Sequence, residues 1–301
     1  MPDAHMEARA VEQAAALIRA GRLVAFPTET VYGLGANALD ARAVKLIFAA
    51  KGRPRTSPLI VHVDSIAMAR SLAAEWPDAA ELLARRYWPG PLTVVLPKRP
   101  EVPDIVTAGL PTVGLRMPAH PLALALIRAA GVPIAAPSAN RFTGLSPTLA
   151  AHVAGSLAEF VLDGGPSEVG IESTVVSLAG EPLLLRPGVI PLPEIEALIG
   201  PLPVAAPPSE AAHPAPGMHE RHYRPTTPLY LLHTGDRPPA GRGAWLRLGH
   251  EMPAEPRPYA AALYETLHRL DRQGLDWIAV ERPPDTPEWA GVLDRLRRAA
   301  V

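Results

Sequence analysis

The stretch from Phe26 to Leu39 reads FPTETVYGLGANAL and decides how the rest of the chain can be interpreted. It follows the short apolar run LVAF and precedes a helical pattern that begins near Asp40. An ordinary connection needs one or two turn residues, whereas this one carries hydroxyl groups, a carboxylate, a phenol and two glycines. Because binding residues concentrate in loops held by a rigid scaffold, we interpret the stretch as a loop that forms one wall of a small-molecule pocket.

Around this loop, residues 1–200 alternate short apolar runs with helical patterns. The alternation predicts an α/β domain with a substantial mixed sheet, because such runs are typical of strands buried on both faces. Asp40 and Ser65 are candidate N-caps, and Gly131 is a natural residue to end a helix. Strands are expected at 23–26, 59–63, 92–97, 113–117, 133–136, 160–163 and 173–178, and helices at 40–51, 65–73 and 120–131.

A proline-rich segment then separates two units. Proline disfavours a helix and biases residues 201–228 towards an extended linker. The following residues, 229–301, show a smaller α/β pattern with strands at 229–233, 243–249 and 277–282 and helices at 259–273 and from 288. The predicted organisation is therefore a domain at 1–200, a linker at 201–228 and a small C-terminal α/β domain of Rossmann-like type at 229–301.

Composition excludes several classes of protein. The 301 residues are 48% hydrophobic and 20% charged, which is typical of a globular chain. No uninterrupted apolar run is long enough for a membrane span, and the acidic N-terminus is unlike a secretory signal. The absence of cysteine excludes disulfides and agrees with a cytoplasmic location. With a net charge of −1, a nucleic-acid partner would need a local basic face.

Common catalytic signatures are missing. The sequence contains no GxxxxGK[ST], HExxH or GxSxG motif. His219 and His222 lie three residues apart without carboxylate partners, so we interpret them as a solvated surface feature. No metal site is expected in the protein itself.

Six polar clusters remain, each beside the end of a predicted strand or helix. Each has a structural explanation: cations after a helix can offset its dipole, and serines or glycines can form ordinary turns. Arg116 lies in an apolar strand and must meet an acid from the protein or from a ligand. Together the clusters predict a ligand site where strand ends converge. They lie at 28–32, 51–57, 112–116, 138–146, 164–174 and Arg186.

Several of these segments resemble the YrdC-type family. The similar motifs are FPTETVYGLGANA, KGR, PLIVHV, WPGPLT, RMPAHP, PIAAPSAN and GIESTVV with LLRPG. The segment PGMHERHYRP and the small tail after it look like the long, two-domain form of the family. The resemblance covers about residues 10–225 and implies a twisted mixed sheet with flanking helices.

The resemblance also implies a reaction. L-Threonine, bicarbonate or CO2, and ATP would give L-threonylcarbamoyl-AMP and pyrophosphate, with Mg²⁺ accompanying ATP. Other proteins would then transfer the threonylcarbamoyl group to an adenosine of certain tRNAs, so direct contact with tRNA is possible but not required. Such a displacement at phosphorus needs positioning and positive charge rather than a covalent nucleophile.

Carried over by motif, the resemblance implies two neighbouring subsites. Lys51 and Arg53 would act in catalysis, and Tyr223 would close over the pocket as a lid. Position 219 is His where this linker motif commonly has Lys. The threonine site would comprise Thr30, His62, Arg116, Ala136 and Ser173. The nucleotide site would comprise Lys51, Arg53, Ser57, Thr112, Ser138, Asn140, Ser146, Arg186 and Tyr223.

Two other functions stay open from the sequence. One is a double-stranded RNA-binding module without catalysis, although the near-neutral charge suits a small ligand better. The other is a carbamoyltransferase relative that forms a carbamoyl-adenylate. Stabilisation by threonine with ATP, but not by RNA, would exclude the first, and a threonine requirement for pyrophosphate release would exclude the second.

Overall fold

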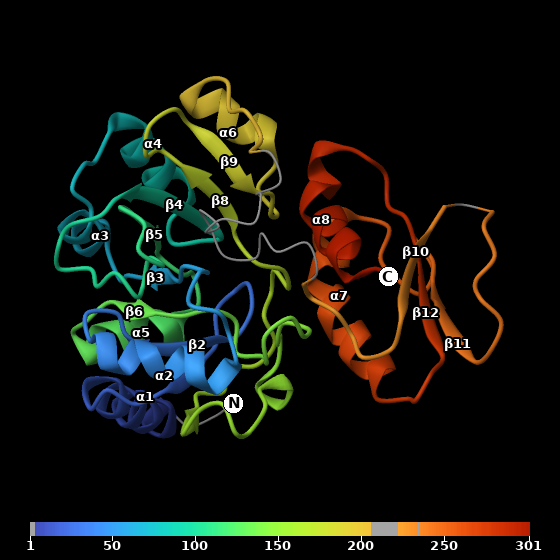
Figure 1. Cartoon of the computed structure of the whole chain (residues 1–301), viewed down its shortest axis with the longest axis horizontal. Coiled ribbons are helices and arrows are strands. Elements are labelled where there is room, and N and C mark those ends of the chain that lie inside the picture. The colour runs from blue at the N-terminus through green and yellow to red at the C-terminus, as the bar shows by residue number, and fades with distance from the viewer. Residues whose placement is uncertain (1–3, 206–221, 234) are drawn as a thin grey trace.

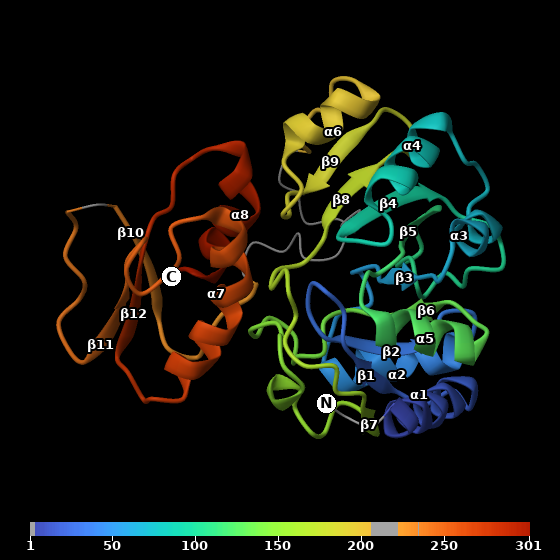
Figure 2. The same ribbon diagram turned by 180° about the vertical axis from the view of Figure 1, so that it is seen from behind.

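The computed structural model describes residues 4–205, 222–233 and 235–301. A larger N-terminal domain contains a broad sheet with helices on both faces, and a smaller C-terminal domain lies beside it (Figures 1 and 2). The predicted linker lies mostly outside the described residues, as does His219. The exact domain boundaries stay predictions.

The larger domain is built on a nine-stranded sheet among the described residues, in the order β7-β1-β2-β6-β3-β5-β4-β8-β9. The pairs β1–β7, β3–β5 and β4–β8 are parallel and the other neighbours are antiparallel, which confirms the predicted mixed sheet. Its strands are β1 (Val24–Phe26), β2 (Gly33–Asn37), β3 (Ile60–His62), β4 (Leu92–Pro97), β5 (Thr112–Arg116), β6 (Ile134–Ala135), β7 (Phe160–Val161), β8 (Thr174–Ser177) and β9 (Leu183–Arg186).

Helices cover both faces of this sheet. Helices α1 and α5 pack on one face, where they bury Val24 and Phe26, while α2, α4 and α6 contribute to the core on the other. Asp40 and Ser65 cap α2 and α3 as predicted, and Gly131 ends α5 with a φ of 69°. The helices are α1 (Ala4–Arg19), α2 (Ala41–Lys51), α3 (Ile66–Leu72), α4 (Asp78–Tyr87), α5 (Pro121–Ala130) and α6 (Leu192–Ile199), with a 3-10 turn at Ala150–His152.

The stretch FPTETVYGLGANAL is only partly a loop, which corrects the expectation from its sequence. Its second half is strand β2, antiparallel to β1. A Cβ atom on Gly35 would lie 2.8 Å from side-chain atoms of both Phe26 and Ile134. The glycines therefore allow close packing of neighbouring side chains within the sheet, and the loop proper is the turn at 27–32.

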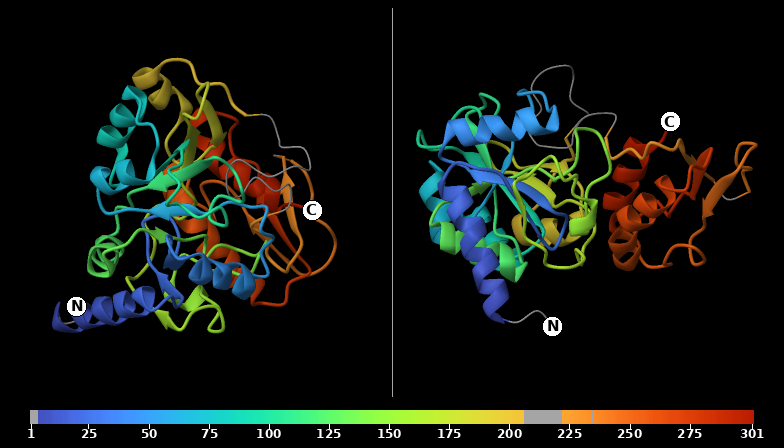
Figure 3. Two further views of the ribbon diagram at one scale, coloured as in Figure 1. Left: turned by 60° about the vertical axis from the view of Figure 1, so that its left-hand side comes forward. Right: turned by 90° about the horizontal axis from the view of Figure 1, so that it is seen from below.

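The C-terminal domain has a three-stranded parallel sheet in the order β10-β12-β11. Helices α7 and α8 lie between this sheet and the larger domain, as Figure 1 and the two views in Figure 3 show. Leu263, Leu267 and Leu270 are buried together as predicted. The elements are β10 (Leu229–Leu232), β11 (Gly243–Leu246), α7 (Pro256–Asp271), β12 (Trp277–Glu281), a 3-10 turn at Pro287–Trp289 and α8 (Ala290–Ala299).

The two domains share one apolar cluster. Val31, Leu145 and Ile171 of the larger domain pack in the same cluster as the buried leucines of α7 and α8. Side chains beside the predicted binding loops therefore depend on the C-terminal domain for their burial. Across the described parts of the chain, no helix has the length and apolar character that crossing a membrane requires.

Candidate active site

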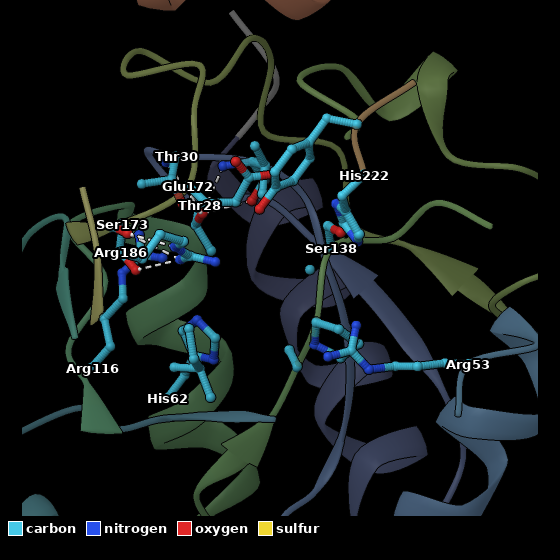
Figure 4. Close-up of a pocket in the computed structure, with 16 residues that line it drawn as sticks. Thr28, Thr30, Arg53, His62, Arg116, Ser138, Glu172, Ser173, Arg186 and His222 are labelled. Atoms are coloured by element: carbon cyan, nitrogen blue, oxygen red, sulfur yellow. Dashed lines mark hydrogen bonds between the residues drawn. The ribbon is translucent and has the colours of Figure 1, made fainter. Parts of the chain in front are cut away.

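A small cavity lies in the larger domain where eight segments of the chain converge (Figure 4). Its volume is about 50 Å³. All five residues of the predicted threonine site line it, as do four of the predicted nucleotide site. These nine residues are Thr30, His62, Arg116, Ala136, Ser173, Arg53, Ser138, Arg186 and Tyr223.

Two strand ends supply the charged and aromatic groups on one side. His62 and Arg116 are register partners at the carboxyl ends of the parallel strands β3 and β5. The acid that Arg116 requires is Glu29, whose Oε1 lies 2.7 Å from Arg116 Nη2. Glu29 also accepts a hydrogen bond from the backbone N–H of Ala119 at 3.0 Å, which fixes the carboxylate.

This ion pair leaves part of Arg116 available. Its Nε donates to the Gly90 carbonyl at 3.3 Å, and Nη2 binds Glu29. Its Nη1 makes no hydrogen bond to any described residue, while the side chain lines the cavity. One edge of a buried guanidinium is thus free for the carboxylate of a ligand.

His62 is held neutral beside this cation. Burial, with a smaller contribution from the charge of Arg116, lowers the pKa of His62 to about 3. Its Nδ1 is buried and has no hydrogen-bond partner among the described residues. A neutral imidazole can accept or donate one hydrogen bond without repelling an ammonium group.

Hydroxyl groups continue the same wall. Thr28 Oγ1 lies 2.9 Å from Thr30 Oγ1 and donates to the Val31 carbonyl at 2.6 Å, which fixes the turn after β1. Ser173 Oγ lies 2.8 Å from Thr93 Oγ1, a residue of strand β4. This end of the cavity is therefore small, hydroxyl-rich and organised before any ligand binds.

Two further guanidinium groups line the cavity (Figure 4). Arg186 lies beside Ser173, to whose hydroxyl its Nη2 donates at 3.2 Å, and Arg53 lies on the other side. Arg53 Nη2 donates to the Ser57 hydroxyl and to the Pro58 carbonyl, and its Nε is buried without a hydrogen-bond partner in the described part of the chain. Arg186 donates to the Ser173 carbonyl from Nε at 3.1 Å and from Nη2 at 3.0 Å. Burial lowers the pKa of Arg53 to about 10 and also lowers that of Arg186. Guanidinium groups stay protonated in proteins, so the two side chains favour an anion in the cavity.

Lys51 supports a loop and does not line the cavity. Its ammonium donates to the backbone carbonyls of Ser138 and Asn140, and lies 3.4 Å from Asn140 Oδ1. Asn140 in turn donates to the Gly144 carbonyl at 2.7 Å. Burial lowers the pKa of Lys51, with the charge of Arg53 as the second cause. These contacts hold the loop after β6, which presents Ser138 to the cavity.

The remaining predicted nucleotide residues also lie outside the cavity lining. Ser57 accepts from Arg53, and Ser146 donates its hydroxyl to the Glu172 carboxylate. Thr112 begins β5, four residues before Arg116, so about 13 Å of extended strand separates them. The structure thus divides the predicted set into cavity walls and residues that support those walls.

Three polar lining residues were not predicted as site residues. Thr28 belongs to the opening loop, and Glu172 precedes Ser173 in the sequence GIES. His222 is buried at 4% exposure and lines the cavity, so its interpretation as a solvated surface residue is wrong. Its ring packs edge-on against Tyr223 and Phe142, which removes it from water.

Tyr223 fills much of the space at the cation-rich end. It adopts a left-handed φ of 62° and is 1% exposed. Its hydroxyl is buried and has no hydrogen-bond partner among the residues described. A cavity of about 50 Å³ has room for only a few water molecules. A nucleotide could enter only if this side chain moved.

Comparisons with known proteins agree with this fold. A family model described as "Telomere recombination" matches residues 16–188, and one described as "Threonylcarbamoyl-AMP synthase, C-terminal domain" matches residues 190–301. The chain is 44% identical to the threonylcarbamoyl-AMP synthase of Bacillus subtilis over 96% of this chain and 92% of that protein. It is 36% identical to that of Schizosaccharomyces pombe over 97% and 88%.

A solved structure extends the likeness to three dimensions. The crystal structure of P. abyssi Sua5 complexed with L-threonine superimposes with a TM-score of 0.90 at 42% identity, covering 96% of this chain and 93% of that one. Fold and site define a two-domain α/β protein with an arginine-lined cavity in its larger domain. The chain belongs to the threonylcarbamoyl-AMP synthase family.

Proposed function

We propose that this protein makes L-threonylcarbamoyl-AMP and pyrophosphate from L-threonine, bicarbonate or CO2, and ATP. One observation carries the proposal: a single cavity brings together the whole predicted threonine site and the guanidinium groups of Arg53 and Arg186. Threonine would occupy the hydroxyl-rich end and the nucleotide the cation-rich end. The threonine bound in P. abyssi Sua5 supports this choice of substrate.

At the threonine end, the free edge of Arg116 would bind the amino acid carboxylate. Neutral His62 and the hydroxyls of Thr30 and Ser173 would bind the amine and the β-hydroxyl group. Ala136, a small residue in the wall, would leave room for the side chain. A pocket that satisfies a hydroxyl group discriminates strongly against an amino acid that lacks it.

The chemical step follows from this placement. The threonine amine attacks CO2 and loses a proton, which gives a carbamate. A carbamate oxygen then attacks the α-phosphorus of ATP, a new P–O bond forms, and the bond to the leaving pyrophosphate breaks. Arg53 and Arg186 stabilise the negative charge that develops on the phosphates, and positioning supplies much of the remaining rate acceleration.

Lys51 would act through the loop that it holds. By fixing Ser138 and Asn140 it shapes the wall beside the phosphates. Ser57, Thr112 and Ser146 would support the nucleotide from outside the present cavity. Tyr223 would leave its present position when ATP binds and then cover the pocket, which excludes water from a labile mixed anhydride.

Magnesium would accompany the ATP phosphates and reduce their charge during the displacement. Within the described residues, no group of three or more His, Asp or Glu side chains could hold a metal ion. Glu172, the carboxylate at the nucleotide end, is already bound by Ser146, Tyr264 and Arg295. This arrangement fits an ion carried by the nucleotide rather than one bound by the protein alone.

The product would pass to threonylcarbamoyl-transfer proteins that modify tRNA, and the enzyme itself need not touch RNA. The cytoplasmic location and the Rossmann-like character of the C-terminal domain stay predictions.

The deciding experiment is mass spectrometry of the products formed from ATP, threonine and ¹³C-labelled bicarbonate. We expect an adenylate that carries both the label and threonine. Pyrophosphate release without threonine would instead favour a carbamoyl-adenylate enzyme, and the absence of any adenylate, with binding of double-stranded RNA, would favour the non-catalytic alternative.

A further inference from the structure

The C-terminal domain contributes a buried cation directly behind the active-site wall. Arg295 lies on helix α8 and is 1% exposed. Its Nε lies 2.8 Å from Glu172 Oε2, and its Nη2 donates to the Glu172 carbonyl at 3.1 Å. Glu172 lines the cavity, so a side chain of one domain holds a cavity residue of the other.

Glu172 is also bound by two hydroxyl groups. Tyr264 of helix α7 donates to Oε2 at 3.1 Å, and Ser146 of the larger domain donates to Oε1. The carboxylate therefore has donors from both domains and is fixed in one orientation. Together, Arg295, Tyr264, Glu172 and Ser146 form a buried network that we call the interdomain cluster.

The guanidinium of Arg295 also contacts two more parts of the cavity wall. Its Nη1 donates to the Pro187 carbonyl at 2.8 Å, next to the cavity residue Arg186. The centre of the guanidinium lies 5.3 Å from the centroid of the Tyr223 ring. Arg295 thus binds the loop before β8, the end of β9 and the predicted lid residue at once.

The contacts of the interdomain cluster fall mainly on the proposed nucleotide site. Arg295 contacts Tyr223 and the neighbour of Arg186, and both Tyr223 and Arg186 belong to that site. Glu172 directly precedes Ser173 of the proposed threonine site. The proposed carboxylate-binding pair, Arg116 and Glu29, has its own partners within the larger domain. A buried ion pair is weak evidence for stability as such, whereas a saturated polar network restricts its members to one arrangement.

We propose that Arg295 is a positioning residue for nucleotide binding, through which the C-terminal domain completes the active site. It acts by holding Glu172 and the backbone beside Arg186, without touching the substrates itself. The proposal rests on the proposed function, because it assigns the nucleotide to this end of the cavity.

The test compares two arginines on the same helix in the full-length protein. Arg295→Met removes the charged guanidinium but keeps an unbranched stem, and Arg297→Met is the matched control because Arg297 is exposed and pairs with Asp285. Calorimetry would measure the affinity for a non-hydrolysable ATP analogue and for threonine separately. We expect Arg295→Met to weaken the analogue at least 10-fold and threonine less than 2-fold, with Arg297→Met unchanged for both.

A milder variant covers the case in which Arg295→Met does not fold. Tyr264→Phe removes one donor to Glu172 and leaves the cavity lining intact, so we expect a 2- to 5-fold weaker ATP analogue with unchanged threonine affinity. Arg295→Lys should be intermediate, since an ammonium cannot reach all of these partners together. A double-mutant cycle with Glu172→Gln should show non-additive losses for the ATP analogue.

Equal weakening of both ligands would show that Arg295 has only a structural role, and an unchanged affinity for the analogue in the folded variants would overturn the proposal outright. Failure of the proposed function has a different signature: the wild-type protein would release no pyrophosphate from ATP with threonine and bicarbonate.

Discussion

The two ends of the cavity differ in what holds them. The proposed threonine end is fixed by the central sheet, where His62 and Arg116 are neighbours on β3 and β5 and the Glu29 ion pair lies within one domain. The proposed nucleotide end is made from loops, Tyr223 and an ion pair across the domains. One end is therefore preorganised by the fold, whereas the other depends on how two domains and a lid are arranged.

This difference matches what each of the two proposed substrates requires of its pocket. A small amino acid needs a rigid pocket that can recognise it, because preorganisation lowers the cost of binding. A triphosphate is larger than the present cavity, so its end must open, and it must then close against water. Four predictions test whether the two ends are separate.

The largest effect is expected at the proposed threonine end, which the sheet fixes. Arg116→Ala should weaken threonine binding about 100-fold, because it removes a charge-assisted contact worth about 1.5–3 kcal/mol. Calorimetric titration with threonine measures it, and Arg128→Ala, an exposed arginine on α5, is the control. Because the change also leaves Glu29 buried without its partner, Arg116→Lys provides a less disruptive variant, for which we expect about a 10-fold loss. Unchanged threonine affinity in either variant would contradict the assignment of this end.

At the proposed nucleotide end, Lys51→Ala should slow adenylate formation about 10-fold and leave threonine affinity unchanged. The reason is that the loop carrying Ser138 and Asn140 loses the cation that its carbonyls bind. Pyrophosphate release under saturating threonine is the readout, and Lys45→Ala, exposed on the same helix, is the control. A selective loss of threonine binding would instead mean that the two ends are not separate.

The close packing around Gly35 of strand β2 gives a prediction of stability. Gly35→Ala would place a Cβ atom 2.8 Å from Ile134 and Phe26 side-chain atoms, which should cost about 1–3 kcal/mol of unfolding free energy. Gly155→Ala is the control, because its Cβ would meet no atom within 4 Å. Urea unfolding measures both variants, and equal stability would show that the sheet tolerates repacking here.

The smallest effect is expected for the pH dependence of stability, at a contact between the two domains. His152 of the larger domain stacks on His268 of α7 with ring centroids 3.9 Å apart, and burial is the main cause that lowers the pKa of His152 to about 4. Since the unfolded state then binds more protons below about pH 6.5, the stability from this group is present above that pH and is lost as pH falls towards 4. Arg272 also acts on both rings, and Asp271 acts on His268.

Thermal melting between pH 7 and pH 4.5 tests this sign. His152→Gln should reduce the fall in melting temperature by a few degrees, while the control His250→Gln, at an exposed site, should follow the wild type. A steeper fall in His152→Gln would contradict the direction of the pKa shift.

The sequence predicted the proposed threonine end, which the sheet fixes, better than the proposed nucleotide end, for a physical reason. Apolar runs such as 59–63 and 92–97 predicted strands β3 and β4 because local hydrophobicity suffices for buried strands. Strand β2 was missed because its glycines favour a loop locally, and only pairing with β1 and packing against Ile134 make it a strand.

The same limit applies to the site. Arg116 could be singled out because a cation in an apolar strand requires a partner. The role of Glu172 could not, because its partner Arg295 lies 123 positions away and only the packing of the two domains brings them together. His222 was misjudged because a polar linker sequence carries no signal of burial. The burial of His222 results from ring contacts with Phe142 and Tyr223.

The most direct test of the account is a crystal structure with L-threonine and a non-hydrolysable ATP analogue bound together. We expect the threonine carboxylate on the free edge of Arg116, the phosphates between Arg53 and Arg186, and Tyr223 displaced from its present position. A structure in which Tyr223 keeps this position, with the analogue bound elsewhere or Arg116 occupied only by Glu29, would contradict it.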